Sequence, residues 1–368
     1  MKIIVSPNTF KGSLSAVVAT DVIASELREM LNNSEIVTLP IADGGDGTAE
    51  ILAQILHATE HRCCVHNPLM RPIDASYYVL PDGSTAIIGI SSASGIALLQ
   101  PSELNAMKTT TFGTGELMRC AVESGCRHLI VALGGSATCD GGTGLAQALG
   151  VRFYDRQNEE ITTPLCGRKL TEIARYEKPK TLDSLKITVL CDAEATMYGP
   201  QGAAYVYAPQ KGATPAQVKL LDDALRNYAA VLNRSLSDTI EKQRYTGAAG
   251  AAAAGLKALF EAELVSGAEW VLSHVGFEQQ LIDADLVITG EGCVDSQSIA
   301  GKSLGTMLRY TSKYNVPMIV FCGKNELKEP IDGLNVLEIT PKEMSLAQAM
   351  QCDVATDNLR RAVVECFR

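Results

Sequence analysis

The amino-acid sequence predicts an α/β protein. Short apolar segments rich in β-branched residues are followed by glycine-containing loops and then by segments with the apolar spacing of a helix, and this order recurs along the chain. The chain has 368 residues, of which 46% are hydrophobic and 20% are charged. This length and composition allow a large buried core and indicate two domains.

Charge and cysteine usage exclude several classes of protein. The net charge of −10 argues against nucleic acid or an anionic membrane surface as the main partner, although a small anionic substrate remains compatible with a locally basic site. The 11 cysteines contain no CxxC spacing, so neither a zinc ribbon nor a thioredoxin-like motif is indicated. The chain starts directly with a strand-like segment and has no apolar run of membrane-spanning length, so we expect a cytoplasmic protein without a membrane partner.

The N-terminal segment predicts a strand, a loop and a helix. Lys2–Ser6 has the composition of a buried strand, and the helix is expected from Ala16 to about Leu31, with Ser13 or Ser15 as its N-cap. Lys11 stands just before this helix. It could contact a phosphate group there, and the alternative is a solvated loop lysine.

The second strand, Ile36–Leu39, is followed by a motif that carries chemistry. Asp43 and Asp46 flank the pair Gly44–Gly45, and Thr48 begins a helix. Two carboxylates around a glycine pair suit metal or hydroxyl binding, because ligands of open α/β sheets gather at the carboxyl ends of strands. The alternative is a polar turn.

From about Arg62 the pattern changes. Ala75–Leu80 alternates between apolar and polar residues and Thr85–Ile90 is apolar, with a Pro-Asp-Gly turn between them, which predicts an antiparallel hairpin. We take this change as the start of a second domain. Arg71 could bind a carboxylate, and its alternative is a surface ion pair. A helix is expected over Glu116–Glu123.

The stretch LIVALGGSATCDGGTGLAQALG, residues 129–150, predicts a strand, a tight glycine loop and the start of a helix. Glycines let backbone N–H groups approach a ligand closely, and a helix N-terminus favours an anion such as phosphate. Asp140 lies inside this loop, where an anion site usually avoids a carboxylate unless a metal ion lies between them. The alternative is a glycine-rich turn that serves packing alone.

Further along, Ile187–Leu190 is expected to be a strand with Asp192 after its end, a position suited to a metal-holding carboxylate. A helix is expected over Pro215–Ser235. The small-residue run Gly247–Gly255 predicts a close-packed helix or a backbone approach to a ligand, with helical spacing continuing through Leu264.

The C-terminal part returns to strands and glycine loops. Leu286–Thr289 is an apolar strand followed by GEGCVDSQSIAGKS, which is not a Walker A loop because Ser296 stands where that motif needs its first glycine. Lys302 could still reach a phosphate, and Asp295 could hold a metal ion. Pro317–Phe321 is a further strand, and Ser345–Arg368 is helical by pattern, with one candidate break near Asp353.

Several carboxylates, lysines and backbone N–H groups around parallel strands suit phosphoryl transfer, which depends on positioning and charge neutralisation. No histidine lies in a glycine loop, which weakens the case for Ser-His or Cys-His catalysis and for a histidine metal site. The residues alone therefore predict an α/β enzyme that acts on a phosphorylated ligand, or a protein that binds one.

The chain resembles the class I, bacterial-type, glycerate kinase family. The resemblance runs nearly from end to end in the order of the family's motifs, which are FKGSLSA (10–16), ADGGDGT (42–48), GGSATCDGG (134–142), PQKGA (209–213) and TGEGCVDSQS (289–298). It implies ATP- and Mg²⁺-dependent phosphorylation of D-glycerate, with 2-phosphoglycerate as the usual product. It makes no prediction about oligomeric state.

The resemblance also implies two α/β domains with the active site in the cleft between them. A Rossmann-like domain with a parallel sheet would be discontinuous in sequence and comprise residues 1–65 and 285–368. A mixed α/β domain would comprise residues 66–284.

We predict roles for nine residues. Asp192 and Asp295 would hold Mg²⁺ or orient the substrate hydroxyl, and Asp43 is the other candidate for the general base. Lys11 and Lys302 would neutralise phosphate or the glycerate carboxylate. The donors offered to the nucleotide phosphates or the substrate would come from Gly134, Gly135, Ser136 and Gly141.

Four positions depart from the family's usual motifs. Asn8 replaces an aspartate, Gly89 a glutamate, Ala195 an asparagine and Cys293 an arginine. Arginine and cysteine are not interchangeable in carboxylate recognition, so these changes could alter metal binding or substrate choice. The alternatives are a kinase of the same fold for another small hydroxy acid, or a catalytically impaired homologue that binds a nucleotide or anion.

Overall fold

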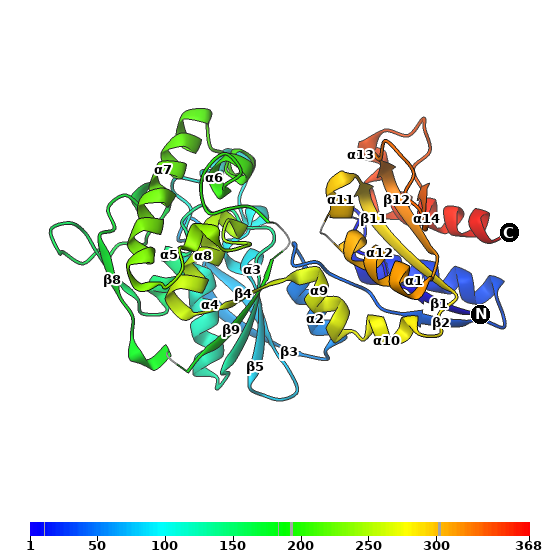
Figure 1. Cartoon of the computed structure of the whole chain (residues 1–368), viewed down its shortest axis with the longest axis horizontal. Helices are drawn as coiled ribbons and strands as arrows, with labels where there is room; N and C mark the ends of the chain where they lie inside the picture. The colour runs from blue at the N-terminus through cyan, green and yellow to red at the C-terminus, as the bar shows by residue number, and fades with distance from the viewer. Residues whose placement is uncertain (11, 183, 192–193, 301–302) are drawn as a thin grey trace. The chain divides into compact units, whose positions relative to one another are not determined.

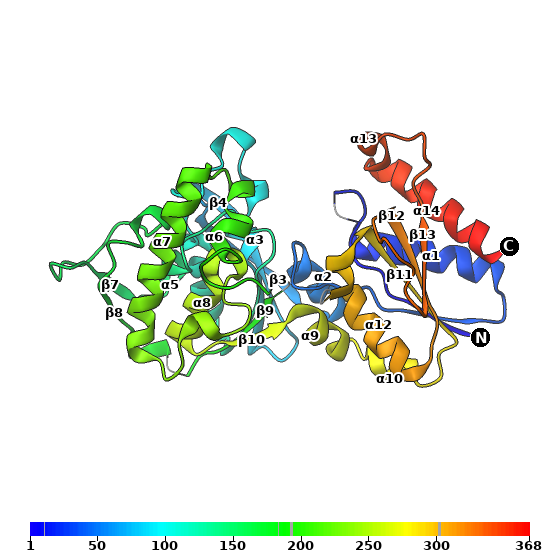
Figure 2. The same ribbon diagram turned by 45° about the horizontal axis from the view of Figure 1, so that its top comes forward.

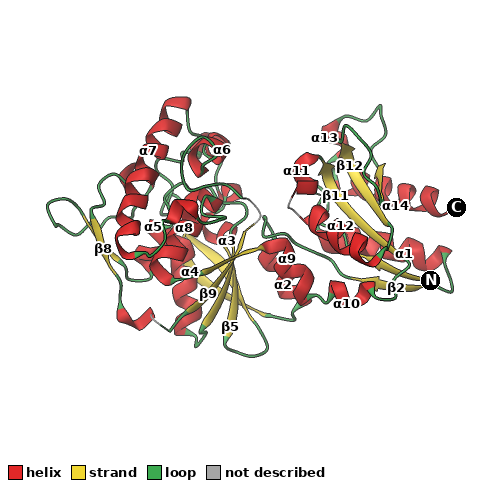
Figure 3. Cartoon of the chain, viewed as in Figure 1, coloured by secondary structure: helices red, strands yellow, loops and turns green. Residues whose placement is uncertain are grey.

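The computed structural model describes residues 1–10, 12–182, 184–191, 194–300 and 303–368 (Figure 1). The chain forms two compact units: unit 1 comprises Met1–Asp43 and Ala268–Arg368, and unit 2 comprises Gly44–Gly267. Each unit contains its own sheet and its own helices (Figure 3). The α/β class is therefore confirmed, and the first unit is discontinuous in sequence.

Unit 1 is built on a five-stranded sheet of order β13-β12-β11-β1-β2, in which every neighbouring pair is parallel. Its strands are β1 (Lys2–Val5), β2 (Glu35–Thr38), β11 (Leu286–Val294), β12 (Met318–Asn325) and β13 (Leu334–Glu338). Ile3 of β1 pairs with Ile36 on one side and with Leu286 on the other. The two ends of the chain therefore form one sheet, with blue strands beside yellow and orange ones in Figure 1.

The longest helices of unit 1 cover this sheet. The helices are α1 (Ala16–Met30), α9 (Gly267–His274), α10 (Phe277–Leu281), α11 (Ser296–Ala300), α12 (Ser303–Tyr314), α13 (Leu346–Ala349) and α14 (Cys352–Phe367). Helix α1 begins where expected, because Ser15 Oγ accepts a hydrogen bond from the N–H of Val18 at 3.2 Å. Helices α1 and α14 lie beside each other (Figure 2), and Leu27 and Leu359 pack into one apolar core with Ile3.

Unit 2 is built on a six-stranded mixed sheet of order β10-β9-β6-β5-β4-β3. Its strands are β3 (Thr59–His66), β4 (Pro72–Val79), β5 (Thr85–Gly89), β6 (His128–Ala132), β9 (Lys186–Cys191) and β10 (Glu263–Ser266), and a separate two-stranded sheet pairs β7 (Arg152–Tyr154) with β8 (Arg175–Glu177). The pairs from β5 to β10 are parallel, whereas β4 is antiparallel to β3 and β5. The predicted hairpin is confirmed as β4–β5.

The helices of unit 2 pack around a core centred on the parallel strands. They are α2 (Thr48–Ile55), α3 (Ile90–Ser94), α4 (Phe112–Glu123), α5 (Thr143–Ala148), α6 (Ala203–Tyr207), α7 (Pro215–Leu232) and α8 (Ala248–Phe260). Short 3₁₀ turns lie at Ile96–Leu98, Pro101–Glu103, Gly167–Lys169, Lys180–Leu182, Pro209–Lys211, Asn233–Ser235 and Ile240–Lys242. Leu129 and Val131 of β6 are fully buried in a cluster that includes Leu117 of α4, Leu145 of α5 and Leu256 of α8.

The limits of the two units fall earlier in the chain than the expected limits at residues 65 and 285. Residues 44–65 lie in unit 2 because α2 packs against β5 and β3 pairs along its whole length with β4. Residues 268–284 lie in unit 1, where Glu269 of α9 accepts a hydrogen bond from the hydroxyl of Tyr310 at 3.1 Å.

Three expected element boundaries are wrong. Helix α4 begins at Phe112 and not at the expected Glu116. The glycine loop expected after Thr289 begins only after Val294, because β11 keeps its parallel pairing with β12 as far as the pair Val294–Asn325. The helical spacing expected to continue through Leu264 ends at Phe260, since Glu261 adopts a left-handed backbone (φ 56°) that stops α8. Leu264 then pairs with β9 as part of β10.

The small-residue run at the start of α8 serves a close backbone approach. Ala249, Gly250 and Ala251 have positive φ angles, and the carbonyl of Gly250 accepts a hydrogen bond from the N–H of Gly141 at 3.0 Å. A Cβ on Gly250 would lie 2.6 Å from Cα of Cys139. The glycine loop after β6 and the start of α8 therefore pack backbone against backbone.

None of the helices formed by the described residues is long and apolar enough to cross a lipid bilayer.

Candidate active site

In unit 2, the segments that follow the neighbouring parallel strands β5 and β6 meet at the carboxyl ends of those strands. The loop after β6 is tied to the end of α3 and to the turn that follows it. Ala137 donates its N–H to the carbonyl of Ser94 at 2.8 Å, and Ile96 donates its N–H to the carbonyl of Gly135 at 2.8 Å. The carboxyl edge of an open α/β sheet is where ligands of this class of fold bind. The sequence-predicted glycine loop thus lies where a ligand site is expected.

The two glycine-rich motifs contact each other directly. Gly134 donates its N–H to the carbonyl of Gly44 at 2.9 Å, and a Cβ on Gly134 would overlap the backbone of Gly45 and Asp46. A Cβ on Gly135 would lie 2.6 Å from Oδ1 of Asp46. Gly134 can approach the backbone of Gly45 and Asp46 this closely only because it carries no side chain itself. The packing explains the glycines at positions 134 and 135.

Asp140 has a structural explanation that the sequence did not suggest. Its carboxylate is fully buried and accepts hydrogen bonds from the N–H and Oγ1 of Thr111, both at 2.8 Å, and from the N–H groups of Gly142 and Gly144 at 3.1 and 3.3 Å. Burial raises the pKa of this carboxyl, and the hydrogen bonds oppose the rise. Asp140 therefore fixes the start of α5 and the loop before α4, which accounts for a carboxylate in this loop without a metal ion.

Gly141 belongs to the same packed region. Its N–H already donates to Gly250, its φ is +62°, and a Cβ would lie 2.8 Å from the ring of the buried Tyr228. The geometry gives Gly141 a packing role and leaves its N–H without capacity for a phosphate. Likewise the N–H of Gly134 is used by Gly44. Among the described residues, none accepts a hydrogen bond from the N–H of Gly135.

Ser136 lies beside a buried lysine. Lys211, which is only 2% exposed, donates from Nζ to Ser136 Oγ at 2.8 Å and to the carbonyl of Thr138 at 2.7 Å. A buried ammonium group is stable only when hydrogen bonds replace its water. Sequence reasoning did not select Lys211 as a site residue, although PQKGA is one of the motifs that carry the family resemblance.

In unit 1, a polar cluster lies at the carboxyl ends of β1 and β2. Asn8 Nδ2 donates to Asp43 Oδ2 and to Ser303 Oγ, both at 3.1 Å, and Asn8 is held by a hydrogen bond from its N–H to the carbonyl of Gly290 at 2.9 Å. Asn8 and Ser303 are buried, whereas Asp43 is half-buried. The structure thus brings the predicted Asp43 together with two residues that were not predicted as site residues.

Asp295 follows β11 and is locally fixed. Its Oδ1 accepts hydrogen bonds from the N–H and Oγ of Ser298 at 2.8 and 3.0 Å. An aspartate oriented in this way offers a carboxylate oxygen, the kind of ligand that Mg²⁺ prefers. The remaining predicted site residues, Lys11, Asp192 and Lys302, lie outside the described residues.

The positions that depart from the family's motifs differ in their surroundings. Gly89 is buried at the end of β5, where a Cβ would lie 3.2 Å from both Ala49 Cβ and Ser92 Oγ. Cys293 is exposed on β11 opposite Lys324 of β12, and partial burial raises the pKa of its thiol. A Cβ at position 89 would therefore require its neighbours to shift by a few tenths of an ångström, while Cys293 has room for a different side chain.

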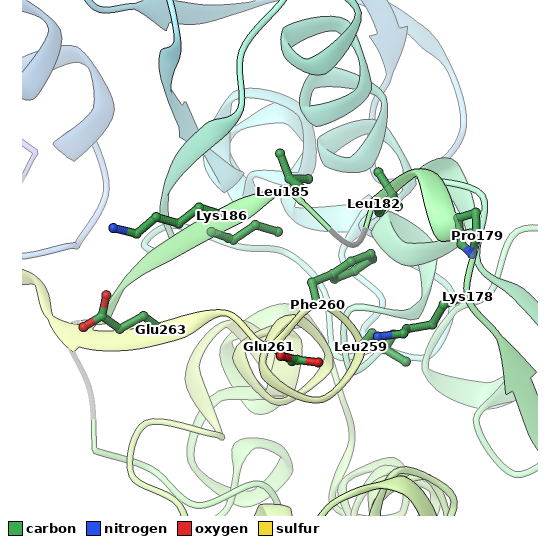
Figure 4. Close-up of a pocket in the computed structure, with 10 residues that line it drawn as sticks. Lys178, Pro179, Leu182, Leu185, Lys186, Leu259, Phe260, Glu261 and Glu263 are labelled. Atoms are coloured by element: carbon green, nitrogen blue, oxygen red, sulfur yellow. The ribbon is translucent and has the colours of Figure 1, made fainter.

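Two other features lie apart from these loops. In the described part of the chain, no group of three or more His, Cys, Asp or Glu side chains could hold a metal ion. A pocket of about 320 Å³ in unit 2 is lined by residues at the amino ends of β9 and β10, including Lys186 and Glu263 (Figure 4). It therefore lies at the opposite edge of the sheet from Ser136.

Glycine-rich loops at the carboxyl ends of parallel strands, with a buried lysine beside them, are typical of α/β enzymes that handle phosphorylated ligands. Comparison with known proteins places the chain within that class. The model of the glycerate kinase family matches residues 3–368. The chain therefore belongs to the glycerate kinase family. It is an enzyme, a kinase that uses ATP, and glycerate is the substrate that the family implies.

Individual relatives agree with this assignment. A glycerate 2-kinase from Escherichia coli strain K12 is 38% identical over 327 residues, which cover 88% of this chain and 85% of that protein. A glycerate kinase from Halalkalibacterium halodurans is 36% identical over 358 residues, which cover 95% of this chain and 93% of that protein. A crystal structure from Salmonella typhimurium LT2, described as a candidate glycerate kinase 2, superposes with a TM-score of 0.84 at 36% identity and covers 100% of this chain and 97% of that chain.

Proposed function

We propose that this protein transfers the γ-phosphoryl group of ATP to the 2-hydroxyl group of D-glycerate, giving 2-phosphoglycerate and ADP. The structural observation that carries the proposal is the packing of residues 44–46 against Gly134 and Gly135, beside Ser136, at the carboxyl ends of β6 and β9. Family membership supports glycerate and ATP as substrates. The name of the Escherichia coli relative, glycerate 2-kinase, supports the 2-hydroxyl as the acceptor.

In this reaction the hydroxyl oxygen of glycerate forms a bond to the γ-phosphorus, and the bond between that phosphorus and the oxygen bridging it to the β-phosphate breaks. The hydroxyl proton must pass to a base. We assign this role to Asp43, because Asn8 donates a hydrogen bond to one oxygen of its carboxylate and so fixes the orientation of that carboxylate in the segment that follows β2.

Negative charge on the transferred group requires hydrogen-bond donors and cations. In the described residues, Gly135 and Ser136 are the members of the glycine loop that we expect to bind an anionic oxygen, since the N–H groups of Gly134 and Gly141 have partners within the protein. Lys11 and Lys302 remain our candidates for neutralising phosphate or carboxylate.

We expect the nucleotide to be used with Mg²⁺. Asp295, whose position is fixed by Ser298, and Asp192 would hold the ion through their carboxylate oxygens. When bound, Mg²⁺ supplies charge neutralisation for the phosphate oxygens.

The test is the rate of ADP release with Mg-ATP and a panel of small hydroxy acids. We expect kcat/KM for D-glycerate to exceed that for L-glycerate, glycolate and D-lactate by about tenfold or more, because each analogue loses or misplaces a hydroxyl group that the site binds. A different hydroxy acid at the top of the panel would support the alternative of a same-fold kinase with another substrate. The exposed Cys293, at the position of an arginine in the family's motif, is the observation that favours that alternative.

A further inference from the structure

Two contacts of the Lys211 side chain tie it to one loop. Nζ is buried and donates to Ser136 Oγ at 2.8 Å and to the Thr138 carbonyl at 2.7 Å. Both acceptors belong to the loop that follows β6. The N–H groups of Gly134 and Ala137 independently anchor the backbone of this loop to Gly44 and Ser94. The bond to Ser136 therefore acts on a side chain of a loop that already has backbone anchors.

The bond from Lys211 determines the direction of the serine hydroxyl. An ammonium group has only donors, so Ser136 Oγ must accept this hydrogen bond, and the serine proton is left for another acceptor. Within the described part of the chain, no group accepts that proton. Ser136 is itself only 7% exposed. A buried hydroxyl proton without a protein acceptor is suited to a ligand oxygen.

We propose that Lys211 is a positioning residue that fixes Ser136 as a hydrogen-bond donor to an anionic oxygen of a substrate. This inference rests on the proposed function, and it defines what Ser136 recognises. The acceptor is a carboxylate oxygen of glycerate or a phosphoryl oxygen of ATP, because a donor next to a cation binds a charged oxygen more strongly than a neutral one. Lys211 acts through Ser136 and does not itself touch the substrate.

The test is a double-mutant cycle read by calorimetry, with D-glycerate and ATP titrated separately into the wild-type chain, Ser136→Ala, Lys211→Met and the double variant. We expect the affinity for one of the two ligands to fall about tenfold or more in each single variant, while the affinity for the other stays within about twofold. The ligand that weakens identifies the source of the oxygen. The double variant should bind that ligand no more weakly than the weaker single variant, within about twofold, because the two residues form one unit.

Kinetics provide a readout that loss of stability would not produce. The KM of the affected substrate should rise, while the KM of the other should not. Lys2→Met is the matched control, because Lys2 is also largely buried, with a side chain 12% exposed, yet lies at the start of β1 in unit 1. Ser136→Ala leaves the buried lysine in place, so it can be measured even when Lys211→Met does not fold.

Two results would overturn the inference: unchanged affinities for both ligands in Ser136→Ala, or single-variant losses that multiply in the double variant. Failure of the proposed function would give a different result from these two, because the wild-type chain would bind neither D-glycerate nor ATP. That result would remove the inference as well.

Discussion

Gly134 donates its backbone N–H to the carbonyl oxygen of Gly44 at 2.9 Å, so the two motifs that are richest in glycine and aspartate are joined through their backbones. Since a Cβ on Gly134 would overlap the backbone of Gly45 and Asp46, this approach depends on the absence of a side chain. The relationship links the loop after β6 to the segment before α2 and fixes the part of unit 2 to which we assign substrate binding.

Gly134→Ala should therefore separate these loops. We expect the free energy of unfolding to fall by about 1–3 kcal/mol, as is usual for overpacking, and kcat/KM to fall by about 10²-fold because the donors of the loop move. Urea denaturation and ADP release measure the two effects. Gly83→Ala is the control, because a Cβ there would have no neighbour within 4 Å, so its positive φ is the single source of strain. It should lower stability slightly and leave kcat/KM unchanged; wild-type kinetics in the Gly134→Ala variant would contradict the account.

Asp43→Asn tests the proposed general base. The substitution keeps the shape of the side chain but removes its basicity, so kcat should fall by about 10²-fold or more while KM for D-glycerate changes little. Steady-state rates with both substrates varied measure this. Asp21→Asn, on the exposed surface of α1, is the matched control and should behave as wild type. A kcat within a few-fold of wild type in Asp43→Asn would exclude Asp43 as the base.

Asn8→Asp should change the pH dependence of the rate. It would place a second carboxylate about where Asn8 Nδ2 now lies, 3.1 Å from Asp43 Oδ2. Two carboxylates at this distance cannot both ionise readily, so the loss of the second proton from the pair has a raised pKa. A higher pH is therefore needed to produce the deprotonated base. The acidic limb of the kcat/KM profile should move to higher pH. An unshifted limb in a folded variant would show that Asp43 does not control that limb.

His128 predicts a pH dependence of stability. Burial, followed in size by the charge of Lys186, its neighbour on β9, lowers the pKa of His128 from its usual 6.5. Below about pH 6.5 the unfolded chain then binds this proton more readily than the folded chain, so the stabilisation present at higher pH is lost as the pH falls through the folded-state value. The melting temperature should fall less steeply with acidification in His128→Gln than in wild type.

The control for this measurement is His57→Gln, because His57 is exposed at the end of α2. It should follow the wild-type curve. Parallel curves for wild type and His128→Gln between about pH 7 and about pH 5 would contradict the assignment.

Much of the fold could be predicted because its signals are local. The strand β1 and the helix α1 follow from a short apolar run and from the cap Ser15, and the β4–β5 hairpin follows from alternation around a Pro-Asp-Gly turn. The extension of β11 to Val294 could not be predicted, because it depends on pairing with Asn325, and glycines within GEGC indicate a loop when considered alone.

In the candidate site, too, local signals could be predicted and contacts between distant residues could not. Asp43 and Ser136 could be selected from their motifs, whereas the partners that orient them, Asn8 and Lys211, are distant in sequence and become evident only through contacts. Asp140 illustrates the opposite case. A carboxylate in a glycine loop suggests a metal ion, but its four hydrogen bonds come from Thr111, Gly142 and Gly144, and Thr111 lies far from it in sequence.

The most direct test of the central claim is the identity of the product formed from D-glycerate and Mg-ATP. The product is offered to enolase, with and without phosphoglycerate mutase, while ADP release is followed in parallel. The account predicts that ADP is released and that enolase consumes the product without the mutase, because 2-phosphoglycerate is the substrate of enolase. Absence of ADP release at high enzyme concentration, or a product that enolase consumes only when the mutase is present, would contradict it.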